Sequence, residues 1–120
     1  DLETQLDVFV AWAQEELVDP RWTTLEFEFA AASSRNPWVA NQLVARHREI
    51  VELVRLLVVD LSQRFNLRGQ ENADRTAAAL LSVGIGLGAL RALDSKVDMN
   101  VFGDVVRTMI RASSPKAEPA

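Results

Sequence analysis

Few residues of this chain could do chemistry, and their types exclude most catalytic and metal sites. The 120 residues include no cysteine and a single histidine, His47. Thiolate catalysis, zinc sites with sulfur ligands and multi-histidine metal sites are therefore excluded. The serines lack a glycine-rich nucleophile elbow, and no Glu-x-x-His motif of a di-iron site is present. We expect no catalytic residue, no metal and no cofactor, and predict that the chain is not an enzyme.

Two polar residues stand among apolar ones at helical spacing. His47 lies on the apolar stripe of one predicted helix, and Glu26 shares a side of another with Trp22 and Phe29. A buried charge needs a partner, so Glu26 would pair with His47, an arginine or a ligand group. A buried histidine is also typical of an ordinary hydrogen-bonded core, and that alternative stays open. Polar groups in an aromatic-lined helical cavity are typical of small-molecule sites, so we predict a ligand pocket. Its predicted lining is Phe9, Trp12, Glu26, Phe27, Trp38, His47 and Ile50.

Glycines concentrate in one apolar segment. Residues 84–89, Gly-Ile-Gly-Leu-Gly-Ala, match the dinucleotide-binding pattern, but strong helix formers stand where that pattern requires a strand. Each glycine inside a helix costs about 1 kcal/mol relative to alanine, so three of them indicate a compensating close approach of two backbones. We predict that this helix and the last one form a two-fold dimer surface; the alternative is that they complete the monomer core. The predicted dimer contacts are Ala77, Leu80, Leu81, Gly84, Gly88, Phe102, Val106 and Met109.

Apolar spacing is helical almost throughout the chain, so we predict an all-α domain of five helices over residues 1–112. The second helix is apolar on nearly all sides, which predicts a central position between neighbours. Asp19-Pro20 and Asn36-Pro37 are typical helix starts, and Gly69 is a candidate helix cap. The expected helices cover about residues 2–18, 20–34, 37–65, 72–93 and 101–112, and residues 113–120 form a disordered tail.

The net charge of −4 is unevenly distributed. Residues 1–34 carry eight acidic side chains and one arginine, whereas residues 35–120 carry nine acidic and twelve basic ones. The acidic balance argues against nucleic-acid binding by this domain itself. The two parts could attract each other within one fold, or form solvated helix faces of unequal sign. The most apolar stretch, residues 77–90, is too short to span a bilayer, so we expect no membrane association.

Several short motifs follow one another along the chain: Trp22-x-x-Leu25-x-x-Glu28-Phe29, Ala31-Ala32, Arg35-Asn36-Pro37 and Arg46-His47-Arg48. With the glycine-rich helix and the short last helix, their order resembles the C-terminal domain of TetR-type (tetracycline-repressor-like) transcriptional regulators over about residues 2–111. The resemblance implies a small ligand held between the first three helices. It also implies a homodimer in which the last two helices form a four-helix bundle with their mates. The DNA-binding head that opens members of this family is absent from the chain.

On this resemblance, the chain is the effector-binding and dimerisation half of a bacterial, cytoplasmic regulator. Its partners would be a second copy, a largely apolar small-molecule effector, and DNA through the missing N-terminal head. Ligand binding would favour one arrangement of the helices and so change the spacing of two heads. The alternatives are a ligand-free helical interaction module and a small helical enzyme of the chorismate-mutase kind. The enzyme would need inward-facing arginines, whereas Arg48, Arg55 and Arg75 fall on outer faces.

Overall fold

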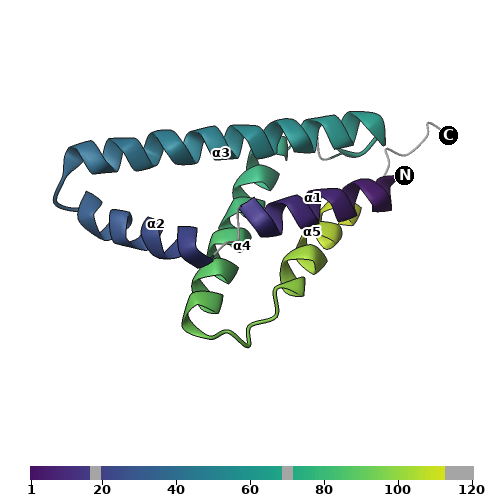
Figure 1. Cartoon of the computed structure of the whole chain (residues 1–120). Coiled ribbons are helices and arrows are strands. Elements are labelled where there is room, and N and C mark those ends of the chain that lie inside the picture. The colour runs from purple at the N-terminus through teal and green to yellow at the C-terminus, as the bar shows by residue number, and fades with distance from the viewer. Residues whose placement is uncertain (17–19, 69–71, 113–120) are drawn as a thin grey trace.

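The computed structural model describes residues 1–16, 20–68 and 72–112, and these residues form five helices (Figure 1). The helices are α1 (Leu2–Glu16), α2 (Pro20–Ser33), α3 (Pro37–Arg64), α4 (Ala73–Leu93) and α5 (Asn100–Ala112). The all-α prediction of five helices is confirmed, with each described boundary within one residue of its expected place. The predicted end of the first helix at Val18, the cap residues Asp19 and Gly69, and the tail lie outside the described residues.

The longest helix, α3, lies along one edge of the molecule (Figure 1). It packs against α2, with which it forms a hairpin, and against α4, which also contacts α2 and α5. α1 packs against α5 at the opposite end of the molecule from the α2–α3 turn. The molecule measures 58 × 33 × 18 Å, so its smallest dimension is about that of two helices. Many side chains therefore have a neighbouring helix on one side only.

Local capping explains both ends of α3. The side-chain oxygen of Asn36 accepts hydrogen bonds from the backbone N–H groups of Trp38 at 3.1 Å and Val39 at 3.5 Å, and proline follows the cap. At the other end Asn66 adopts a left-handed conformation with φ of 52°. The N–H of Leu67 then donates to the carbonyl of Ser62 at 2.9 Å, which is the Schellman arrangement. Asn66 therefore ends α3, ahead of the predicted glycine, because asparagine tolerates this conformation.

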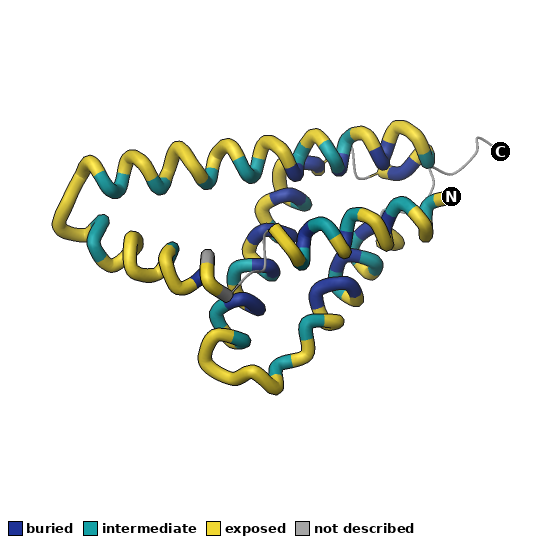
Figure 2. Tube along the Cα trace, in the orientation of Figure 1, coloured by how far each residue is buried: buried dark blue, intermediate teal, exposed yellow. Residues whose placement is uncertain are grey.

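The core lies where α1, α4, α5 and the C-terminal half of α3 meet (Figure 2). On its surface, Arg107 of α5 binds Asp7 of α1 at 2.6 Å, and Arg111 binds Glu3 at 3.0 Å. The acidic first helix and the basic last helix thus attract each other. Of the two possibilities for the uneven charge, attraction within the fold therefore applies to this pair of helices. The buried core residues are Leu6, Val10, Ala13, Val54, Val58, Leu61, Leu67, Ala73, Ala77, Leu80, Leu87, Phe102, Val106 and Ile110.

The prediction that the second helix is central is wrong. Leu25, Phe27 and Phe29 of α2 are 41%, 54% and 51% exposed, and among the described side chains of this helix only Thr23 is buried. The physical reason is visible in Figure 2, where the α2–α3 hairpin extends beyond the other helices. The half of α2 near the turn has α3 on one side and solvent on the other. Its two apolar faces are therefore not both covered within this chain.

The residues predicted as dimer contacts are mostly covered within the single chain, which corrects that assignment. Seven of them are buried, and the eighth, Met109, packs half-buried against the same core. A Cβ atom added at Gly88 would overlap the side-chain oxygen of Thr23. The close approach that the glycines indicated thus exists at this position, but between α4 and α2 of one chain. The seven buried positions are Ala77, Leu80, Leu81, Gly84, Gly88, Phe102 and Val106.

The apolar helix α4 extends beyond residues 77–90, the stretch from which a membrane span was judged too short. It has 21 residues, and an 18-residue window within it has a mean hydropathy of 1.6, with a third of that window buried. By length and composition alone this helix reaches what a membrane span requires, which corrects the estimate from residues 77–90. Core helices of soluble proteins meet the same criterion, and Ala73, Ala77, Leu80 and Leu87 of α4 belong to the buried core cluster.

Candidate ligand-binding groove

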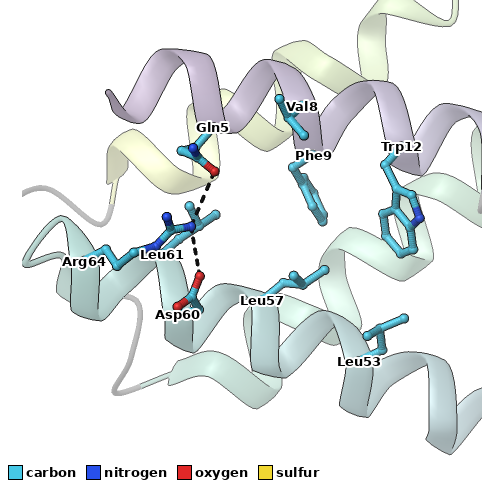
Figure 3. A pocket seen from close by; sticks show the side chains of 9 residues that line it. All are labelled: Gln5, Val8, Phe9, Trp12, Leu53, Leu57, Asp60, Leu61 and Arg64. Atoms are coloured by element: carbon cyan, nitrogen blue, oxygen red, sulfur yellow. Dashed lines mark hydrogen bonds and ion pairs between the residues drawn. The ribbon is translucent and has the colours of Figure 1, made fainter.

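An apolar groove of about 470 Å³ runs between α1 and α3 (Figure 3). Its volume falls in the range of about 300–1,000 Å³ that is usual for small-molecule sites. Because side chains three or four residues apart share one face of a helix, each helix contributes one continuous wall. The lining residues are Gln5, Val8, Phe9 and Trp12 of α1, and Leu53, Leu57, Asp60, Leu61 and Arg64 of α3.

Aromatic and aliphatic side chains form the body of the groove. Phe9 and Trp12 point from α1 toward Leu57 and Leu53 of α3 in Figure 3. The two rings lie 6.1 Å apart between centroids and are tilted by 39°, which is an ordinary aromatic pair geometry. Leu53 is 45% exposed, so this part of the groove is open to solvent along one side. An apolar guest could therefore enter without displacing the core.

Polar side chains gather at one end of the groove. Arg64 binds Asp60 at 2.9 Å and donates to the side-chain oxygen of Gln5 at 3.4 Å (Figure 3). Both members of the ion pair are about half exposed. The opposite end is lined by Trp12 and Leu53, which carry no charge. The groove thus has an apolar end and a hydrogen-bonding end.

The structure does not bring the seven predicted pocket residues into one cavity. Phe9 and Trp12 line the groove, and Ile50 lies half-buried against the core. Phe27 is exposed, and Trp38, 69% exposed, lies near the α2–α3 turn in a separate hollow. The single-cavity prediction is therefore corrected, because α2 and the first half of α3 extend away from α1. The remaining two residues, Glu26 and His47, lie beside each other outside the groove.

The predicted partner of Glu26 is present. One oxygen of this carboxylate lies 3.7 Å from Nε2 of His47 and 4.0 Å from Nε of Arg46. The contacts join α2 to α3, which satisfies the expectation that a shielded carboxylate needs a cation. Nε2 of His47 is covered from solvent and has no hydrogen-bond partner among the described residues. Glu26 therefore contributes to the hairpin rather than to the groove.

His47 also borders a second hollow, of about 460 Å³, on the opposite side of α3. Four charged side chains surround it: Arg48, Glu52, Arg55 and Asp74. Arg55 donates two hydrogen bonds to Glu52, at 2.6 and 2.8 Å, and lies 3.7 Å from Asp74. The hydrogen bonds from Arg55 lower the pKa of Glu52 and raise the pKa of Arg55. This hollow is a charged surface in which Arg55 is paired with both Glu52 and Asp74.

Sequence reasoning missed the α3 wall of the groove and its polar end. Leu57 and Leu61 share the apolar face of the long helix with His47 in its sequence pattern, and Leu53 lies beside that face, which was the only available signal. A helix whose apolar residues spread beyond one stripe has more than one apolar neighbour to cover. Gln5, Asp60 and Arg64 are ordinary surface residue types, so nothing in their spacing could have indicated the groove.

Among residues 1–16, 20–68 and 72–112, no group of three acidic, histidine or cysteine side chains could hold a metal ion. Compared with models of protein families, with curated proteins and with solved structures, the chain matches none of them.

Proposed function

We propose that residues 1–112 are the effector-binding and homodimerisation domain of a bacterial TetR-type transcriptional regulator, which acts in the cytoplasm. The observation that carries the proposal is the presence of two separate apolar features on one five-helix domain. A ligand-sized groove lies between α1 and α3, and an uncovered apolar face lies on α4. Together they match the two tasks of such a domain, which are to hold an effector and to pair with a second copy.

The uncovered face of α4 consists of small and apolar side chains. Ala78, Ser82, Gly86 and Leu90 are four residues apart, so they form one stripe, and all four are exposed. A Cβ atom added at Gly86 would meet nothing within 4 Å, and Leu90 is 54% exposed. Residues 76–90 include no charged side chain. Small residues let two helix backbones approach closely, so this outer stripe replaces the inward-facing residues as the proposed dimer contact.

The neighbouring helix α5 also leaves apolar side chains uncovered. Val101 is 41% exposed. Val105, which is half-buried, and Thr108, which is exposed, follow it on the same side of the helix. α4 and α5 pack against each other. A second copy that covered both helices would form the four-helix arrangement that the family resemblance implies. Its two-fold symmetry would place each stripe against its own mate.

The groove and the dimer face are connected through α3. This helix forms one wall of the groove and also packs against α4. A ligand that binds more tightly to one spacing of α1 and α3 would favour the matching position of α4. In a dimer, a shift of α4 changes how the two copies are oriented and hence the distance between two DNA-binding heads. The coupling works only through such a difference in affinity between the two arrangements.

Sedimentation velocity of the chain 1–120 tests the dimer contact. We expect the unmodified chain to be a dimer and the Leu90→Glu variant to be a monomer, because two glutamates would be buried near the symmetry axis. Leu56→Glu is the matched control, since Leu56 is 51% exposed on α3, away from the stripe. A chain that is monomeric at every concentration, or equal effects of the two substitutions, would contradict the proposal.

A second candidate is a helical interaction module. It is favoured by the exposed apolar side chains of the α2–α3 hairpin, where Phe27, Phe29 and Trp38 are between 51% and 69% exposed. Exposed aromatic groups of this kind are typical of protein contact surfaces. The groove separates the two candidates, because an interaction module has no use for a small ligand bound between α1 and α3.

A further inference from the structure

We propose that the groove between α1 and α3 takes an amphiphile with an elongated apolar body and an uncharged, hydrogen-bonding head group. The inference rests on the proposed function, since it names the ligand class of the same groove. The polar groups of the groove lie at one end, where they form an ion pair, and the other hollows described above lack this arrangement.

The apolar body follows from the walls. Phe9 and Trp12 face Leu53 and Leu57, and none of these four side chains carries a charge. Gln5 and Trp12, which mark the two ends of the α1 wall, are seven residues apart, or about 10 Å along the helix. A ligand that contacts both ends is therefore elongated, and an unbranched alkyl chain of about that length suits the space. Burial of such a chain supplies affinity without any directed contact.

The single head group follows from the position of the polar side chains. Gln5, Asp60 and Arg64 all lie at the end where α1 begins and α3 finishes. Their amide, carboxylate and guanidinium groups offer both donors and acceptors. A ligand with its polar atoms at one end can satisfy these groups while the rest of its length stays on the apolar walls. A ligand that is polar at both ends would place one of them against Trp12 and Leu53.

The absence of charge on the head group follows from the ion pair. Asp60 and Arg64 lie 2.9 Å apart, so their charges cancel at short range. An anionic head would be drawn to Arg64 but repelled by Asp60, and a cationic head would meet the opposite problem. Either ion also loses hydration when it enters the groove. A hydroxyl, carbonyl or amide head group loses little and can still hydrogen-bond to Gln5 or Arg64.

The other hollows do not share this arrangement. The one beside His47 is bordered by four charged side chains. The one between α1 and α5 is bordered by Asp7, Asp104 and Arg107, of which Asp7 and Arg107 already bind each other at 2.6 Å. The hollow near Trp38 has charged residues along its α3 side, Arg46 and Glu49. Of these hollows, the α1–α3 groove alone combines a long uncharged wall with polar groups at one end.

Octan-1-ol, octanoate and octylammonium are the probes, because all three have eight carbons and their head groups are neutral, anionic and cationic at pH 7. Binding to the chain 1–120 is followed by the fluorescence of Trp12, with Trp22→Phe and Trp38→Phe removing the other two tryptophans. We expect octan-1-ol to bind at least about fivefold more tightly than either ion. No binding of octan-1-ol up to its solubility, or equal affinities for the three probes, would overturn the inference.

Two sets of variants place the chain and the head group. Leu57→Gln should weaken octan-1-ol binding about tenfold, whereas Leu56→Gln, next to it but outside the groove, should leave binding unchanged. Asp60→Asn should strengthen octanoate binding about two- to fivefold, and Arg64→Gln should do the same for octylammonium, as expected for half-exposed ion pairs. Both side chains are about half exposed, so we expect neither substitution to disturb the core. If neither Asp60→Asn nor Arg64→Gln changed the relative affinities for the three probes, the placement of the head group at this end would be overturned.

The oligomeric state keeps this inference separate from the proposed function. A chain that binds octan-1-ol as described but stays monomeric contradicts the dimerisation domain and supports the ligand class. A dimer whose probe binding is unaffected by Leu57→Gln contradicts the ligand class and leaves the dimer standing. The two measurements use the same protein but different variants.

Discussion

Thr23 of α2 lies directly against Gly88 of α4. The threonine is 2% exposed, and its side-chain oxygen occupies the space that a Cβ atom at position 88 would need. The helix-weakening glycine is thus offset by the close packing of α2 on α4 within one chain. Gly86, two residues earlier, faces open space and has no such role inside the monomer.

The two glycines should respond oppositely to the same substitution. Gly88→Ala should lower the free energy of unfolding by about 1–3 kcal/mol, because Thr23 cannot move aside without disturbing the packing of α2. Gly86→Ala should raise it by about 0.5–1 kcal/mol, because alanine favours the helix and meets no neighbour. Urea unfolding followed by circular dichroism measures both, in a Leu90→Glu background so that dimerisation does not contribute. Equal effects of the two substitutions would show that α2 does not rest on Gly88.

The cap at the start of α3 should contribute measurably to stability. Asn36→Ala removes the side chain that accepts from the N–H groups of Trp38 and Val39, so we expect a loss of about 1 kcal/mol. The matched control is Asn41→Ala, an exposed asparagine one turn into the same helix. There the change should be neutral or slightly stabilising, because alanine is the better helix former. A loss at position 41 as large as that at position 36 would argue against the cap.

The pairing of Glu52 with Arg55 predicts a dependence of stability on pH. The hydrogen bonds from Arg55 lower the pKa of Glu52 in the folded chain. A carboxylate whose pKa is lower in the folded state stabilises that state at neutral pH, and this contribution is lost as the pH falls through the folded pKa. The loss therefore begins below the ordinary glutamate value of about 4.3.

Urea midpoints at pH 7 and pH 3.5 test this dependence. The fall in midpoint on acidification should be smaller for Glu52→Gln than for the unmodified chain, because the variant has no carboxylate to protonate at this position. For Glu49→Gln, on the same helix, the urea midpoint should fall on acidification as much as it does for the unmodified chain. A Glu52→Gln variant that follows the unmodified chain at both pH values would show that the pair adds nothing.

The helices and the pairing of Glu26 with His47 could be predicted because local signals determine them. Apolar spacing located all five helices, and proline after asparagine marked the start of α3. Glu26 was expected to pair with His47, an arginine or a ligand group, and His47 and Arg46 lie 3.7 and 4.0 Å from it. The helices depend on residues close together in the sequence, and the pairing of Glu26 follows from the cost of burying an unpaired charge.

The sequence did not decide whether the predicted stripe of α4 faces the core or a second copy, because alanine, glycine and leucine occur on all sides of this helix. Apolar spacing shows which face of a helix is buried only when the opposite face is polar, and residues 76–90 include no charged side chain on any face. The same ambiguity made α2 look central, although Phe27 and Phe29 are exposed. The groove was only half predicted because its two walls lie about 50 residues apart in the sequence, and their approach depends on how α1 and α3 pack with the other helices.

The central claim is that this domain serves a DNA-binding regulator, and the coding sequence immediately upstream of Asp1 tests it most directly. We predict that this sequence encodes a basic three-helix head with a helix-turn-helix, continuous with α1. Protein that includes the head should then bind DNA as a dimer. A start codon directly before Asp1, or an upstream segment with no basic helix-turn-helix, would contradict the regulator and leave the groove as the site of a protein with another task.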